Sequence, residues 1–236
     1  MSFNLRSKTA ALLIFFFPFV SLCADSFLDD IHLAGLAGIF YFAADNGVNS
    51  DSAPIIPALG VSAGWQFVNF LRLELTEDIY FQNYEYNTVR GYPMACNPEN
   101  RAALVIGFVT GIQLTGLFPV GEKGIQIRAY GGPAADIRLV LPAVSGAQTE
   151  TDAIAKYFWS DARWFMPTVG FGMDFPLNEK FFLGFDLRTW VPVYKLWAKD
   201  GAPAVDGWRF GIGLRITPRK KPAEKKQDEE TEDDNL

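Results

Sequence analysis

Charged side chains, together with one glutamine, recur at every second position of several apolar segments, and they are the residues of this sequence that could carry chemistry. The residues at these positions are Arg72, Glu74, Gln113, Arg128, Asp136, Arg138, Asp174, Asp186, Arg188, Arg209 and Arg215. Arginines and carboxylates that share one face of a sheet can form the wall of a polar conduit that selects solutes by charge. They can also pair with one another and close the space between them, because a buried charge must be paired or is very costly.

The stretch 165–193 shows most clearly which elements must position these side chains. Its odd positions, such as Phe171 and Met173, are large and apolar, whereas the even positions are small or polar. The pattern resumes after the polar turn 176–180. A period of two indicates a β-strand, and two such runs joined by a short turn indicate a hairpin. Long strands with one apolar face and one face of Gly, Asp and Arg are typical of transmembrane β-barrels.

The same alternation predicts eight strands along the chain. We expect them at 31–42, 58–67, 70–84, 102–116, 125–140, 165–175, 181–193 and 208–216, with an interruption of the fifth at 131–133. Their connections alternate long and short, which is the layout of an up-and-down barrel with long extracellular loops and short periplasmic turns. The sequence therefore predicts an all-β, eight-stranded antiparallel transmembrane β-barrel in a bacterial outer membrane, with both termini in the periplasm. The facing of the first strand stays open, because Ala and Gly fall on both of its faces.

As a set, these strands resemble the small eight-stranded outer-membrane proteins, which include OmpA-type transmembrane domains and the OmpW/OprG family. The resemblance covers 31–217 and rests on architecture, since no diagnostic motif is present. OmpW-like barrels usually end on an aromatic residue that serves the insertion machinery, whereas here Ile216 is followed by a long charged tail. With this tail, the chain looks more like a spirochaetal barrel than a proteobacterial one. The resemblance implies outer-membrane lipids and the barrel-assembly machinery as partners.

The two ends of the chain differ in composition from the strands. Residues 1–24 have the charged start, apolar centre and small residues of a secretory signal peptide. Lipidation of Cys23 is an alternative, which Leu22 before it disfavours. We expect the barrel to occupy 25–217 and the charged segment 218–236 to be a disordered periplasmic tail.

Two functions are compatible with this barrel. One is a passive channel or uptake barrel for small solutes, hydrophobic ones included. The other is a structural or adhesin-like barrel with a closed, salt-bridged lumen, whose loops 86–100 and 142–160 contact host or environmental ligands. Eight strands leave a lumen barely wide enough for side chains, which favours closure. An OmpW-like resemblance adds a lateral exit into the membrane, and the residues that could leave the ladder open for it are Gly131, Gly132, Pro133, Pro167 and Pro192.

Other classes of chemistry are not expected. A barrel hydrolase needs a histidine near a serine and a carboxylate at the outer rim, and the single histidine, His32, begins the first strand at the opposite end. One histidine and two cysteines give no metal constellation, and no glycine-rich phosphate loop is present, so we expect neither an enzyme nor a cofactor. The net charge of −6 argues against nucleic acid as a partner.

Overall fold

The structure, a computed structural model, describes residues 31–43, 55–89, 91–121, 124–198 and 207–219. Its strands are β1 (Ile31–Ala43), β2 (Ile55–Val68), β3 (Leu71–Asn87), β4 (Tyr92–Ala95), β5 (Ala103–Val120), β6 (Ile125–Gly132), β7 (Ala134–Pro142), β8 (Thr168–Pro176), β9 (Phe181–Trp190) and β10 (Trp208–Pro218). Its helices are α3 (Gln148–Trp159) and the short η1 (Pro98–Asn100), η2 (Ser160–Ala162) and η3 (Val193–Leu196). The predicted signal peptide with Cys23, and all of the predicted tail after Arg219, lie outside the described residues.

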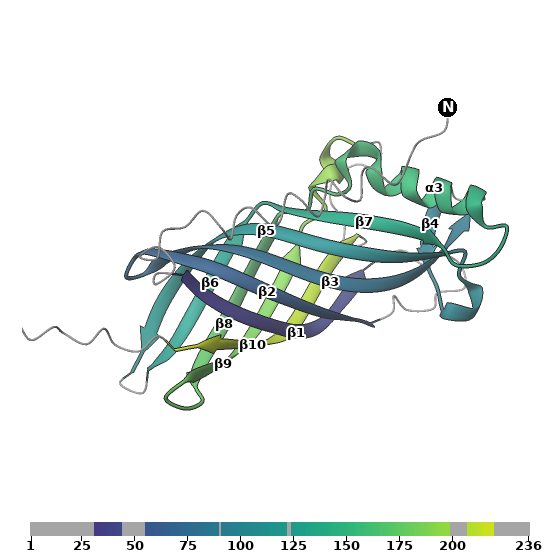
Figure 1. The fold of residues 1–236 in the computed structure, drawn as a ribbon. Coiled ribbons are helices and arrows are strands. Elements are labelled where there is room, and N and C mark those ends of the chain that lie inside the picture. Colours follow the sequence, from purple (N-terminus) through teal and green to yellow (C-terminus); the bar gives the residue numbers. More distant parts are fainter. Residues whose placement is uncertain (1–30, 44–54, 90, 122–123, 199–206, 220–236) are drawn as a thin grey trace, which may run out of the picture.

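Antiparallel pairing closes the sheet into a ring. β1 pairs with both β2 and β10, and β3 pairs with β5, so the order around the wall is β1, β2, β3, β5, β6 with β7, β8, β9 and β10. β6 and β7 together make one wall strand, because both pair with β5 and only Pro133 separates them. The predicted fold class, a closed eight-stranded antiparallel barrel, is confirmed (Figure 1).

The wall has an apolar outer face and a polar inner face. On β2, Leu59 and Val61 point outward and are 68% and 61% exposed. On β6, Arg128 points inward and is fully buried. The facing of the first strand, which the sequence left open, is set by Phe40, whose ring is buried in the lumen while Ile39 is exposed outside.

The fifth wall strand is interrupted where the sequence predicts it. Proline lacks a backbone N–H and therefore cannot continue the ladder on both sides. The carbonyl oxygen of Pro133 still accepts the N–H of Ile112 at 3.0 Å. Gly132 is required beside it, because a Cβ there would collide with the carbonyl oxygen of Ile112. The interruption is thus a bulge that β5 holds in place.

One end of the barrel is taller on one side. β3, β5 and β7 continue beyond the rim formed by the other strands, β4 pairs with the end of β3, and α3 packs against β7, β3 and β4 (Figure 1). The prediction that 86–100 and 142–160 are long loops is therefore wrong in detail. The first contains the end of β3, β4 and η1, and the second contains α3. Among the described residues, none of the helices has the length and apolar character needed to cross a membrane.

Candidate functional site: the lumen

Arg128 on β6 is the centre of one cluster of ion pairs in the lumen. Its Nε and Nη2 donate to the two carboxylate oxygens of Asp174 on β8 at 2.7 and 3.1 Å. Its Nη1 and Nη2 also donate to Asp186 on β9 at 3.2 and 3.1 Å. The hydroxyl of Tyr130 donates to Asp186 at 2.9 Å. One guanidinium therefore joins three wall strands through bidentate hydrogen bonds, which are the strong kind.

Arg188 and Asp78 form an ion pair across the lumen. Nη1 of Arg188 lies 2.6 Å from Oδ2 of Asp78, and Nη2 lies 3.2 Å from Oδ1. β9 and β3, which carry these residues, are four places apart in the ring of eight and so face each other. The pair spans the barrel from wall to wall.

A third cluster lies toward the end with the short turns. Glu74 on β3 accepts hydrogen bonds from Nη1 of Arg72 at 2.9 Å and from both terminal nitrogens of Arg215 at 3.2 and 3.0 Å. Arg215 on β10 also donates from Nε to the hydroxyl of Thr217 at 3.3 Å. The carboxylate is almost fully buried and sits between two positive charges.

A fourth cluster lies toward the taller end and centres on Asp136 of β7. Arg138 donates from Nε to Asp136 at 2.7 Å, and the hydroxyl of Tyr80 donates to the same carboxylate at 3.0 Å. Arg209 on β10 also pairs with Asp136, through Nη2. Nε and Nη1 of Arg209 have no hydrogen-bond partner among the described residues. Its guanidinium instead lies 4.1 Å from the ring centre of Phe42, in the geometry of a cation–π contact.

An aromatic layer covers this fourth cluster. The ring of Phe40 lies edge-on to Trp190 at 4.8 Å and to Tyr80 at 5.9 Å between centroids. Phe42 packs against Tyr80 at 5.6 Å. Met166, just before β8, belongs to the same buried cluster.

Helix α3 covers the lumen-facing side of the taller wall. The buried side chains of Ile154 and Phe158 pack against Tyr84 on β3 and Val105 on β5. The guanidinium of Arg138 lies 4.2 Å from the ring centre of Phe158, so the fourth cluster also contacts the helix. Thr151, Ile154 and Phe158 recur at helical spacing, which gives α3 one apolar stripe to bury.

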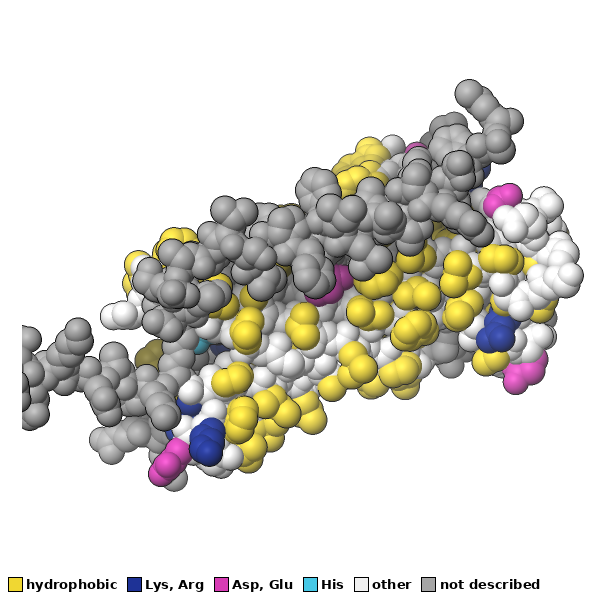
Figure 2. Space-filling model, in the orientation of Figure 1, with side chains coloured by type: hydrophobic (Ala, Val, Ile, Leu, Met, Phe, Trp, Pro, Cys, Tyr) yellow, Lys and Arg dark blue, Asp and Glu magenta, His cyan; other side chains and the backbone are white. Residues whose placement is uncertain are grey.

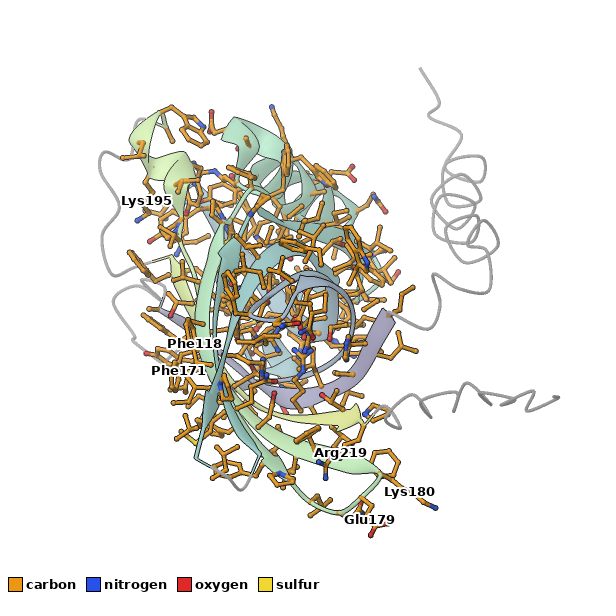
Figure 3. The ribbon with its side chains drawn as sticks, turned by 90° about the vertical axis from the view of Figure 1, so that its left-hand side faces the viewer. Phe118, Phe171, Glu179, Lys180, Lys195 and Arg219 are labelled. Carbon is orange, nitrogen blue, oxygen red and sulfur yellow. The ribbon has the colours of Figure 1, made fainter. Side chains whose placement is uncertain are left out.

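Glycines on the inner face leave room for the large side chains of the lumen. A Cβ on Gly107 would collide with the ring of Tyr80, and one on Gly170 would collide with the ring of Tyr130. Each of these two rings therefore occupies the space beside a glycine of a neighbouring strand and helps to fill the lumen. Figure 3 shows side-chain nitrogen and oxygen atoms gathered inside the ring of strands.

The predicted lumen residues all lie inside the barrel. Ten of the eleven are buried, and the side chain of Arg138 is 13% exposed. Gln113 donates to the hydroxyl of Thr76 at 3.2 Å and joins none of the ion pairs described above. Asp78 continues the inward row of Arg72, Glu74 and Thr76 on β3, and the period of two assigns it to the same face, although it is not among the predicted site residues. Including Asp78, the described lumen contains six arginines and five carboxylates, all of them in the four clusters.

The wall is hydrogen-bonded at the residues considered for a lateral opening. Gly131 and Gly132 pair with Val169 and Thr168 of β8. Beyond Pro133, the N–H of Met166 donates to the carbonyl of Ala134 at 2.9 Å, and the N–H of Asp136 donates to Trp164 at 2.7 Å.

The two remaining prolines considered for the opening lie at the outer ends of β8 and β9. The carbonyl of Pro167 accepts the N–H of Val191 at 2.8 Å, and Pro192 precedes η3. The segment that enters β8 is thus tied both to β7 and to the end of β9.

A metal site is not formed by the described residues, in which no group of three His, Cys, Asp or Glu side chains could hold an ion. The carboxylates of the lumen are instead bound by arginines. The arrangement holds these charges in place, inside a ring of eight strands that is barely wide enough for side chains.

Several solved structures are similar to this chain in shape. One is the crystal structure of Neisserial surface protein A (NspA), with a TM-score of 0.45 and 11% identity over 80% of this chain and 96% of that chain. Another is the Yersinia pestis outer membrane protein Ail in a phospholipid bilayer nanodisc, with a TM-score of 0.39 and 11% identity over 79% and 98% of the two chains. A third is a de novo designed transmembrane β-barrel, with a TM-score of 0.37 and 9% identity over 79% and 94%. At these identities and TM-scores the likenesses carry no conclusion about function.

Sequence comparisons give no family for this chain. No protein-family model matches it. No curated protein matches it either. The resemblance to small eight-stranded outer-membrane barrels is confirmed at the level of the fold, and the OmpW/OprG-like and spirochaetal resemblances stay predictions.

Proposed function

We propose that this protein is a bacterial outer-membrane barrel with a closed lumen, which acts as a structural or surface-interaction protein through its taller end. The proposal includes no catalytic role. It favours the closed, salt-bridged reading of the sequence over the passive channel or uptake barrel. Outer-membrane lipids and the barrel-assembly machinery are the partners that it implies.

Insertion into a membrane is supported by the distribution of apolar side chains. Outward residues from every wall strand, such as Leu59, Phe171 and Ile212, are exposed. Figure 2 shows hydrophobic side chains, in yellow, spread along the face of the barrel that it displays. Monomeric proteins in water rarely expose so large an apolar surface. A closed barrel satisfies its backbone hydrogen bonds internally, as a hydrocarbon environment requires.

The proposed orientation follows from the lengths of the connections. The short connections from β2 to β3, from β5 to β6 and from β8 to β9 lie at the end where β1 begins and β10 ends. At this end the N–H of Arg219 donates to the carbonyl of Lys180 at 2.7 Å, and Glu179, Lys180 and Arg219 lie close together in Figure 3. Because outer-membrane barrels have short periplasmic turns, we infer that the start of β1 and the end of β10 lie on the periplasmic side and that α3 lies at the cell surface.

The ion pair between Arg188 and Asp78 carries the proposal of a closed lumen. It spans opposite walls, and the clusters around Arg128 and Asp136 occupy other parts of the same interior. A solute that crosses the barrel has to separate these charges, and breaking a buried pair is strongly unfavourable. A passive channel would instead leave its charged side chains facing water.

The taller end offers a surface for interaction. On α3, Asp152, Lys156 and Trp159 are exposed while Ile154 and Phe158 hold the helix to the barrel. Exposed polar and aromatic side chains on a rigidly held element are suited to binding a partner, because little order is lost on association. Loop-borne surfaces on a fixed scaffold commonly carry function.

Two assays on the same refolded protein test this proposal. Liposome swelling with sugars of increasing size measures passage through the lumen, and binding of the protein in nanodiscs to immobilised extracellular-matrix proteins and glycans measures interaction. We expect no swelling above that of empty liposomes. We also expect binding that is lost in a D152A/K156A/W159A variant and kept when Leu177 in a short turn is replaced by alanine. Size-dependent swelling of a folded barrel would contradict the closed lumen. Binding that is unaffected by the three substitutions on α3 would contradict the role of the taller end.

A further inference from the structure

A carboxylate interrupts the apolar outer face of the barrel. Glu77 of β3 points outward, and Thr110 of β5, its partner in the ladder, donates its hydroxyl to Oε2 of Glu77 at 2.5 Å. Both residues are half-buried. We refer to these two residues as the Glu77–Thr110 pair.

The pair lies in the middle of the apolar belt. On β3, outward Leu75 precedes Glu77 and outward Ile79 follows it, and both are exposed. The partner of Glu77 on β2 is Val61, which is also exposed.

Two acidic residues occupy outward positions of the described strands. Of these two, Glu77 is the one whose outward neighbours along the strand are apolar on both sides. The other outward acidic residue, Glu85, lies near the end of β3 between Asn83 and Asn87.

A carboxyl group at this depth needs a polar partner. An ionisable side chain in the hydrocarbon region is costly and is by default a sign of function, with a partner at the same depth. One hydroxyl satisfies only part of a carboxyl group, which can accept several hydrogen bonds and can donate one when it is protonated. Acyl chains supply neither donors nor acceptors.

We propose that the face around the Glu77–Thr110 pair binds a second copy of this chain in the membrane. Two copies inserted in the same direction are related by a two-fold axis along the membrane normal, so equal residues of the two copies meet at equal depth. The pair is self-complementary under that axis, because a carboxyl group and a hydroxyl can each donate and accept. Exposed Val61, Leu75 and Ile79 would supply the apolar contact around it.

The second copy is favoured over a different membrane protein by this matching of depth. Any other partner needs its own polar group at the same level in the bilayer, whereas a second copy brings one by symmetry. This inference rests on the proposed insertion into a membrane. It is independent of whether the lumen is closed.

Disulfide crosslinking in lipid vesicles tests the proposal. The full chain, with Cys23 and Cys96 replaced by serine, receives one new cysteine by Leu75→Cys, next to Glu77 on the outer face. The control is Ile212→Cys on β10, which is four places from β5 in the ring and therefore on the opposite wall. Both proteins are folded into phosphatidylcholine vesicles, oxidised with copper phenanthroline and run on non-reducing gels, with the heat-dependent shift in mobility as the measure of folding.

We expect the Leu75→Cys protein to give about tenfold more dimer than the Ile212→Cys protein, and Glu77→Leu to remove this excess. Glu77→Gln should keep it, because an amide also donates and accepts. A folded Leu75→Cys protein that crosslinks no better than the control overturns the proposal, as does crosslinking that persists in full with Glu77→Leu. A chain that does not fold in vesicles overturns the membrane insertion on which the proposal rests.

Discussion

Arg188 and Asp78 lie on opposite walls of the barrel, and the guanidinium of the first is 2.6 Å from the carboxylate of the second. Both side chains are almost fully buried. The pair therefore acts as a strut between β9 and β3, and its two members depend on each other, since each would be an uncompensated buried charge alone.

The first prediction concerns this strut. Asp78→Ala leaves Arg188 buried without its counter-ion and should lower the free energy of unfolding by about 3–5 kcal/mol. Replacing both residues by leucine should recover most of that loss, because apolar side chains of similar volume often substitute for a buried pair. The measurement is urea unfolding in lipid vesicles, followed by gel mobility. An Asp78→Ala variant that is as stable as the original protein would show that the two charges are not coupled.

The second prediction concerns the bulge in the fifth wall strand. Gly132→Ala places a Cβ against the backbone oxygen of Ile112, which cannot move without disrupting β5. We expect a loss of stability of about 1–3 kcal/mol or more, as for overpacking in a core. Gly35→Ala is the matched control, since no atom of the described residues lies within 4 Å of a Cβ there. Equal unfolding midpoints for the two variants would contradict the close approach at Gly132.

The third prediction concerns the attachment of α3. Phe158 is buried against Tyr84 at 5.1 Å between ring centroids and beneath the guanidinium of Arg138. Phe158→Ala should release the helix and make 143–167 sensitive to protease while the barrel keeps its heat-dependent mobility, with a local cost of about 3–5 kcal/mol. Trp159→Ala, on the same helix but half exposed, should leave the cleavage pattern unchanged. Protection of both variants would mean that other contacts hold α3.

The fourth prediction concerns the reactivity of Cys96, which follows β4 at the taller end. Burial, and then the carboxylate of Glu85, raise the pKa of the Cys96 thiol from 9.0 to about 11. The thiol is neutral below its pKa, so at pH 8 alkylation by iodoacetamide should be about 100-fold slower in the folded protein than in urea, where the pKa is normal. The rate should rise about tenfold per pH unit up to roughly pH 10. A folded-state rate equal to the unfolded one would contradict this environment.

The facing of most wall strands could be predicted from the sequence, because a period of two assigns each residue to a face. That rule placed Arg128, Asp174 and Asp186 inside the barrel. It failed for β1, where Ala and Gly fall on both faces, and there the inward direction is decided by the packing of Phe40 against Trp190.

The partners of the lumen charges could not be predicted. Which charges meet depends on the stagger of the strands around the ring, so residues far apart in sequence, such as Arg188 and Asp78, approach each other only after closure. Helix α3 was missed because it lies in a segment between strands and its apolar stripe consists of only a few residues, among them Ile154 and Phe158.

The most direct test of the closed lumen is single-channel conductance of the refolded full chain in a planar bilayer. A porin in the same membranes serves as the positive control, and the heat-dependent gel shift shows that the barrel is folded. The ion pairs across the interior and the aromatic layer above them predict no conductance steps above those of the bare membrane. Regular steps from the folded barrel, lost when the protein is heated before insertion, would contradict the closed lumen and restore the channel as its function.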